Sequence, residues 1–276
     1  VDRDVYDGVS CMGVIQSIRK VQSSEEAEPV TAEIDVDAIN TLIDSALADG
    51  RSFLLAEEGQ GLLNAAQLPG PRGGVVQSVE AAVKLADEIG YPVVMKVVSR
   101  NILHKSDAGG VLLDLDNPAE VIDGYQTIIH SCKANVPNAI IDGIEVVEQI
   151  TAGTEIIIGA RRDANFGTTI MFGLGGIYVE VMKDVAFRAI PLSNRELRSM
   201  IKEIRSYPLL LGVRGEARKD IESIITALEK VASLISKVPR ITDIEINPMV
   251  VYEQGSGARA VDIRVLLSDD KKDSPQ

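Results

Sequence analysis

The sequence is poor in cysteine and has no long apolar run. Its two cysteines, Cys11 and Cys132, are far apart in the chain and form neither a disulfide framework nor a zinc-binding pattern. No apolar stretch approaches the roughly 18 residues of a membrane-spanning helix, and the N-terminal Val-Asp-Arg-Asp lacks the pattern of a signal peptide. We therefore expect a cytoplasmic protein. Because the sequence does not begin with methionine, we also expect a processed chain or a fragment.

Basic residues are also scarce. The chain has 28 lysines and arginines against 41 aspartates and glutamates, which gives a formal net charge of −13. Nucleic-acid-binding proteins usually carry a basic face, so this balance argues against a general nucleic-acid binder. It does not exclude anionic small ligands, because charges more than about 8 Å away are largely screened at physiological salt.

The common nucleotide-binding loops are missing as well. The chain contains no GxxxxGK[ST] loop, and its glycines do not form the GxGxxG fingerprint in the required context. The turn Phe172-Gly-Leu-Gly-Gly176 follows an apolar strand, and Gly173, Gly175 and Gly176 could point N–H groups at an anion. A plain tight turn is the alternative. If the protein binds ATP, it does so with a different architecture.

The length of 276 residues suggests about two structural units. The apolar run Gly8–Ile15 predicts a buried strand with no partner nearby, and therefore the end of an upstream domain. We divide the chain into an upstream remnant, a linker with a helix, an N-terminal lobe, a C-terminal lobe and a flexible tail, at residues 1–22, 23–51, 52–140, 141–267 and 268–276.

Helix and strand signals alternate along the rest of the chain. Four capping residues predict helix starts, at Asp35, Ser78, Asn117 and Ser193. A further helix spans about 220–236, and two final strands, near 243–252 and 259–267, form a hairpin. This alternation predicts an α/β protein of two lobes with mixed sheets and a ligand site between the lobes.

Lys96 lies in the middle of an apolar strand, Val-Val-Met-Lys-Val-Val. Strand alternation puts it on the same face as Val94, opposite Met95 and Val97. A lysine in this position can extend to solvent at a sheet edge. The sharper hypothesis is that it points into a cleft and neutralises a phosphate.

His104 is one of only two histidines, and it lies in a polar loop that ends at Gly109-Gly110. A neutral imidazole has a free nitrogen that can accept a phosphoryl group and release it again. The alternative is a loop histidine bonded to its neighbours. The second histidine, His130, falls late in a helix, where it complements the helix dipole at the surface.

Asn247, in Glu245-Ile-Asn-Pro248, and Asp262 lie on the two strands of the predicted hairpin, which can bring them to one face. Their oxygens suit Mg²⁺, although acidic residues on strands are more often only solvated. Arg214 stands between two glycines in a loop, where its guanidinium can hold a phosphate or simply lie at the surface.

Together and in this order, the motifs resemble the ATP-grasp domain, or β subunit, of the NDP-forming acyl-CoA synthetases, which are relatives of succinyl-CoA synthetase. The resemblance covers about residues 52–267. Its segments are Gly90-Tyr-Pro-Val-Val-Met-Lys96, Ile102-Leu-His-Lys-Ser-Asp-Ala-Gly-Gly110, Gly153-Thr-Glu-Ile-Ile-Ile-Gly159, Met171-Phe-Gly-Leu-Gly-Gly-Ile-Tyr-Val-Glu180, Gly212-Val-Arg-Gly-Glu216, and Glu245-Ile-Asn-Pro248 with Ala260-Val-Asp262.

The resemblance implies an ATP-grasp fold and assigns roles to individual residues. Lys96 would bind the phosphates of ATP or ADP, and His104 would relay a phosphoryl group. The strand end Val146-Val147-Glu148 would lie at the adenine edge. The remaining assignments are Glu155 at the nucleotide cleft, Asn247 and Asp262 as Mg²⁺ ligands, and Gly173, Gly175, Gly176 and Arg214 around the phosphate path.

The family's reaction converts acid, CoA and ATP into acyl-CoA, ADP and phosphate, through acyl phosphate and phosphohistidine. The resemblance therefore implies an α part, fused or separate, that binds CoA and the acid, in an oligomer such as α2β2. Two rival hypotheses stay open. Another ATP-grasp carboxylate ligase would share Lys96 and the metal ligands without needing His104, and a non-catalytic domain would only sense nucleotide or acyl-CoA.

Overall fold

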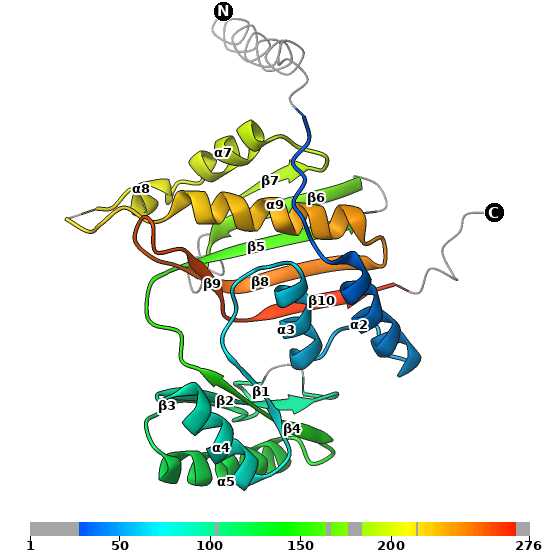
Figure 1. Ribbon diagram of the computed structural model, residues 1–276, viewed down its shortest axis with the longest axis vertical. Coiled ribbons are helices and arrows are strands. Elements are labelled where there is room, and N and C mark those ends of the chain that lie inside the picture. The colour runs from blue at the N-terminus through cyan, green and yellow to red at the C-terminus, as the bar shows by residue number, and fades with distance from the viewer. Residues whose placement is uncertain (1–27, 103–104, 164–166, 176–183, 214, 269–276) are drawn as a thin grey trace, which may run out of the picture.

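The computed structural model describes residues 28–102, 105–163, 167–175, 184–213 and 215–268. These residues form two lobes, each built on its own β-sheet (Figure 1). The predicted N-terminal remnant lies outside the described residues, as do most of the predicted tail and three of the candidate site residues, His104, Gly176 and Arg214.

The smaller lobe is a four-stranded sheet in the order β1-β4-β2-β3, covered by two helices. Its elements are β1 (Gly73–Val76), α4 (Val79–Ile89), β2 (Val93–Ser99), β3 (Val111–Leu115), α5 (Pro118–Asn135) and β4 (Ile141–Glu148). Ser78 and Asn117 cap α4 and α5, as the sequence predicted, because each side chain accepts a hydrogen bond from a backbone N–H of the first turn.

The larger lobe is a six-stranded sheet in the order β10-β8-β5-β6-β7, with β9 also paired to β8. Its strands are β5 (Thr154–Asp163), β6 (Gly167–Leu174), β7 (Val185–Ala189), β8 (Ile241–Val251), β9 (Ala258–Ala260) and β10 (Ile263–Leu267). Its helices are α2 (Val36–Ala48), α3 (Ala56–Ala65), α7 (Asn194–Glu203), α8 (Tyr207–Leu210) and α9 (Ile221–Lys237). The predicted caps Asp35 and Ser193 are confirmed at α2 and α7.

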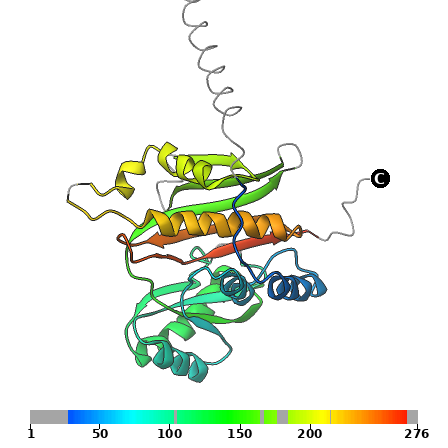
Figure 2. The ribbon, with the colours of Figure 1, turned by 45° about the horizontal axis from the view of Figure 1, so that its top comes forward.

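Helix α9 runs along the larger sheet and buries one of its faces (Figures 1 and 2). The alternation of β5 explains this contact. Ile156, Ile158 and Ala160 point into the core beneath the helices, while Glu155 and Arg161 point to the opposite face. That opposite face is therefore the one available for a site.

Three features differ from the expectation. All pairings among the described strands are antiparallel, where mixed sheets were expected. The expected division at residue 140 falls just before β4, but β4 is a strand of the smaller sheet because Ile144 and Val146 fill that lobe's core. Helix α3, expected within the smaller lobe, packs instead on the core of the larger one through Leu62 and Leu63.

The predicted terminal hairpin is confirmed, with its second strand interrupted. Strands β9 and β10 both pair with β8, and Val261 and Asp262 form the break between them. In the part of the chain that the structure describes, no helix combines the length and the apolar composition needed to cross a membrane.

Candidate functional site

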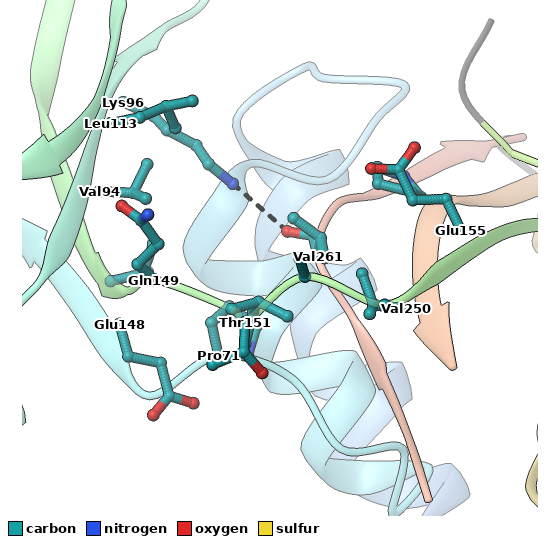
Figure 3. A pocket seen from close by; sticks show the side chains of 15 residues that line it. Pro71, Val94, Lys96, Leu113, Glu148, Gln149, Thr151, Glu155, Val250 and Val261 are labelled. Carbon is teal, nitrogen blue, oxygen red and sulfur yellow. Dashed lines mark hydrogen bonds between the residues drawn. The ribbon is translucent and has the colours of Figure 1, made fainter. Parts of the chain in front are cut away.

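A cavity of about 290 Å³ opens between the two lobes (Figure 3). Val94, Leu113 and Val147 line it from the smaller lobe, and Val250 and Val261 line it from the larger lobe. The chain segment that connects β4 to β5 passes along it. A mostly apolar cavity with a few polar groups is typical of a small-molecule site, and this one lies where the sequence predicted a ligand.

Lys96 brings a positive charge to this cavity. Strand β2 buries Met95 and Val97 in the smaller core, so Lys96 faces the cavity together with Val94, as the alternation predicted. The Nζ atom donates a hydrogen bond of 3.3 Å to the carbonyl oxygen of Val261 in the opposite lobe (Figure 3). Its nearest carboxylate is Glu145, at 3.9 Å. Because neither contact is a short ion pair, the ammonium group can take up an anionic ligand.

Asn247 and Asp262 lie side by side, as the hairpin predicted. Ile246 on β8 pairs with Ile263 on β10, and the N–H of Asn247 donates to the carbonyl of Asp262 at 3.1 Å. Both residues are exposed, and their chain neighbours Pro248 and Val261 line the cavity. The two candidate ligands therefore lie at the rim of the site that holds Lys96.

The donor chemistry of this pair fits Mg²⁺. One carboxylate and one amide oxygen are hard ligands, and Mg²⁺ usually takes one or two carboxylates together with water and phosphate oxygens. No group of three or more histidine, cysteine or acidic side chains among the described residues could hold a metal by itself. The pair is suited to a metal ion that arrives with a phosphate-bearing ligand.

The strand end at residues 146–148 reaches the cavity only in part. Val147 and Glu148 line it, but the Val146 side chain is fully buried in the smaller core. The carboxylate of Glu148 is engaged by Arg72 and Arg259. In Figure 3 it points away from the amine of Lys96.

Opposing effects set the ionisation of Glu148. Burial raises its pKa, but hydrogen bonds from Arg72 and the positive charge of Arg259 outweigh burial and hold the pKa below its usual range. Glu148 is therefore a carboxylate tied to two arginines.

The two candidate glycines that the structure describes, Gly173 and Gly175, do not line the cavity. The N–H of Gly175 donates to the carbonyl of Glu155 at 2.8 Å, so it continues the β5–β6 ladder. A Cβ at Gly173 would lie 2.8 Å from the carbonyl oxygen of Asp184, so this position requires glycine for packing. Glu155 itself lines the cavity. The described glycines are thus explained by close approach of backbone.

Two arginines were missed by reasoning from the sequence. Arg72 precedes β1, and Arg259 lies on the short strand β9, yet both contact Glu148. No local pattern marks them, because their role depends on contacts between segments far apart in the chain. Leu113 was also missed, because its exposure on β3, the strand that pairs with the one carrying Lys96, is visible only in the folded structure.

The fold and the cavity define a two-lobed nucleotide-binding protein of the ATP-grasp class. The chain belongs to the ATP-grasp domain family, whose family model matches residues 45–267. This confirms the fold and the family expected from the sequence motifs.

Among characterised relatives, the chain is 42% identical over 227 residues to the β subunit of ADP-forming acetate–CoA ligase II of Pyrococcus furiosus, covering 82% of this chain and 96% of that subunit. It is 43% identical over 226 residues to the ADP-forming 4-hydroxybutyrate–CoA ligase of Nitrosopumilus maritimus, with the same share of this chain but only 32% of the relative. The chain therefore spans about a third of the length of that ligase.

The fold of this chain is similar to two solved structures of acetyl-coenzyme A synthetase 1 from Ca. Korarchaeum cryptofilum. A complex with coenzyme A and Ca-AMPCP matches with a TM-score of 0.80 and 42% identity, over 83% of this chain and 99% of the matched chain. The second structure is a complex with coenzyme A and Mg-AMPPCP, in which the phosphohistidine segment points towards the nucleotide binding site. It matches with a TM-score of 0.73 and 37% identity, over 83% of this chain and 100% of the matched chain. This chain thus corresponds to the ATP-grasp part of ADP-forming acyl-CoA ligases.

Proposed function

We propose that this chain binds ATP and ADP with Mg²⁺ in the interlobe cavity and performs the phosphoryl-transfer part of an ADP-forming acyl-CoA synthetase. The whole reaction is acid + CoA + ATP ⇌ acyl-CoA + ADP + phosphate. The observation that carries the proposal is the meeting of Lys96, from the smaller lobe, with the segment 261–262 of the larger lobe across an apolar cavity.

Different residues of the cavity bind different parts of the nucleotide. Val94, Leu113 and Val147 offer apolar surface to the flat base. Lys96 exchanges its carbonyl contact for a phosphate oxygen, which gives its charge a stronger partner. Asn247 and Asp262 would hold Mg²⁺, which when bound neutralises charge on the transferring phosphoryl group. The protein's contribution is position and charge, as phosphoryl transfer requires.

We assign the phosphoryl relay to His104. An imidazole nitrogen attacks the terminal phosphorus of ATP, the bond to the ADP oxygen breaks, and ADP leaves with that electron pair. The phosphoryl group then passes from His104 to the α part, which forms the acyl phosphate that CoA attacks. The assignment to His104 rests on its motif; the archaeal relative is described with a phosphohistidine segment that points towards its nucleotide binding site, which agrees with a histidine relay in this class. Arg214 is assigned to the phosphate path on the motif alone.

The proposed partner is an α part that binds CoA and a short-chain organic acid. Relatives in which the matching region is nearly a whole β subunit, and others in which it is about a third of the protein, support both a separate and a fused arrangement. We infer a higher oligomer such as α2β2 and a cytoplasmic location, in keeping with the free thiol of Cys132.

Nucleotide binding is tested by titrating Mg-ATP and Mg-ADP into the full chain in a calorimeter. We expect saturable binding that is strongly weakened in Lys96→Met and retained in Lys84→Met, a matched change at an exposed lysine of α4. Failure of the unaltered chain to bind would favour a domain that has lost its nucleotide function.

The relay is tested by incubating the chain with [γ-³²P]ATP. We expect incorporation into an acid-labile, base-stable protein adduct, as phosphohistidine requires, and no incorporation in His104→Ala. The variant His130→Ala, on helix α5, is the control and should label normally. Equal labelling of the chain and His104→Ala would place the phosphoryl group elsewhere, and no labelling of the chain would favour another ATP-grasp ligase.

A further inference from the structure

The chain passes between the lobes twice, through residues 66–72 and 149–153, and both passages meet at Glu148. Glu148 is the last residue of β4 in the smaller lobe. Its carboxylate accepts hydrogen bonds from the backbone N–H of Arg72 at 3.0 Å and from Nε of Arg72 at 2.8 Å. It also forms an ion pair with Arg259. The Glu148 carboxylate therefore lies next to both segments that connect the two lobes.

Arg259 belongs to the other lobe. It lies on β9, which pairs with β8 in the larger sheet. Its guanidinium also donates to the carbonyl of Gly70 at 3.0 Å, and the neighbouring N–H of Ala260 donates to Pro69 at 2.8 Å. Residues 69–70 are therefore held on the larger lobe, while Arg72 is held on the smaller one. The ion pair of Arg259 with Glu148 spans the connection between them.

The Arg259–Glu148 ion pair is partly buried, so it is expected to contribute to stability. The Glu148 side chain is 12% exposed and that of Arg259 34% exposed, so water screens the pair less than it screens surface pairs. Removing Arg259 would leave a mostly buried carboxylate with only one of its two arginines.

A second polar tie crosses the cavity, but it uses the lysine assigned to the nucleotide. Lys96 donates a single hydrogen bond to Val261. Under the proposed function this bond is given up when phosphate binds. The ion pair of Arg259 with Glu148 touches no group that the phosphates need, so it persists when nucleotide is bound.

We propose that the Arg259–Glu148 pair is an interlobe clamp that holds the two lobes at the angle required for nucleotide binding. Glu148 is then a positioning residue that acts through Arg259 and Arg72, and its carboxylate does not bind the base. The link to nucleotide affinity rests on the proposed function, whereas the mechanical role of the clamp does not. Breaking the clamp should widen the range of interlobe distances and weaken nucleotide binding together.

The mechanical role is tested by measuring the distance between the lobes. Spin labels on Asp123→Cys of α5 and Lys202→Cys of α7, both at exposed positions, report it by pulsed electron resonance in a Cys11→Ala background, and Cys132 stays buried. We expect Arg259→Gln to broaden the distance distribution. The control is Arg264→Gln, because Arg264 is also paired with carboxylates, Asp243 and Glu245, but within the larger sheet alone. An unchanged distribution in Arg259→Gln would overturn the clamp.

The functional role is tested by Mg-ADP calorimetry on the same variants. Arg259→Gln should bind about tenfold more weakly, equivalent to about 1.4 kcal/mol, and Arg264→Gln should bind normally. Arg259→Lys keeps the charge and should recover part of the affinity. If Arg259→Gln fails to fold, Arg259→Lys and Glu148→Gln replace it in both measurements. The clamp would then be refuted if both variants showed the interlobe distances and the nucleotide affinity of the unaltered chain. If the unaltered chain binds no nucleotide, the proposed function fails while the distance measurement still decides the clamp.

Discussion

At the scale of single residues, the strand that contains Lys96 shows how alternation prepares a site. Met95 and Val97 are drawn into the smaller core by their apolar side chains, and the long lysine is left on the opposite face. Its charge is stabilised there by one carbonyl and a carboxylate at 3.9 Å. A charge with such modest partners favours a binding role over a structural one.

Lys96→Met therefore separates binding from stability. The variant should lose about 10- to 100-fold in affinity for Mg-ADP, because a charged hydrogen bond contributes about 1.5–3 kcal/mol. Its free energy of unfolding should change by no more than about 1 kcal/mol, because the lost contacts are weak. Calorimetry and urea denaturation give the two quantities. A large loss of stability with unchanged affinity would contradict the binding role.

The ionisation of Glu148 leads to a prediction about pH. Its pKa in the folded protein lies below the ordinary 4.5, so the charged form stabilises the fold at pH values above 4.5. That contribution is lost as the pH falls through the lowered pKa. The difference in unfolding free energy between the chain and Glu148→Gln should therefore be largest near neutral pH and shrink in acid. A difference that grows in acid would contradict this assignment.

At the scale of elements, the start of α9 is joined to the terminal hairpin by one aspartate. Asp220 caps α9 by accepting the N–H of Ser223 at 3.1 Å. Its other oxygen accepts the N–H groups of Gly255 and Gly257, at 2.9 and 3.0 Å, in the turn between β8 and β9. The side chain thus fixes the hairpin that carries Arg259 and leads to Asp262.

Asp220→Ala should cost about 2–3 kcal/mol in unfolding free energy, because it removes a helix cap and leaves two further N–H groups without their carboxylate partner. Asp35→Ala is the matched comparison. Asp35 caps α2 through one exposed hydrogen bond of 3.0 Å, so its loss should cost about 0.5–1 kcal/mol. Urea denaturation gives the free energy of unfolding of both variants. If both lost the same amount of stability, the contacts of Asp220 with the turn would contribute nothing.

At the scale of the whole molecule, the lobes meet through polar ties around an apolar cavity. The clamp of Glu148 and Arg259 and the bond of Lys96 to Val261 both join the smaller lobe to the hairpin strands of the larger lobe. Under the proposed function, nucleotide binding therefore depends on how these lobes are held, and the proposed α part would act on this same assembly.

Asp262→Asn tests the proposed metal ligand in the complex with the proposed α part. We expect ADP-forming acyl-CoA synthesis to fall at least about tenfold, because a neutral amide holds Mg²⁺ less well than a carboxylate. The melting temperature should change little, because Asp262 is exposed and, among the described residues, its side chain accepts a hydrogen bond only from the adjacent N–H of Ile263. Equal loss of activity and of stability would indicate a structural acid. A panel of short-chain acids in the same assay would identify the substrate.

Local sequence patterns were enough to predict the helices, the strands and the residues that begin them. Caps such as Ser78 and Asn117 mark their helices because they act within one turn, and alternation in β2 gives the face of Lys96 because it needs no distant partner. The hairpin likewise placed Asn247 beside Asp262, since the two strands are close in the chain.

The contacts between distant segments depend on how the whole chain packs. Nothing local assigns β4 to the smaller sheet, makes the pairings antiparallel, or brings Arg72 and Arg259 to Glu148. These contacts join residues that lie far apart in the chain, and the packing of two whole cores selects them. The sequence therefore named the residues of the proposed nucleotide site, and the packing of the two lobes determines how these residues are held together.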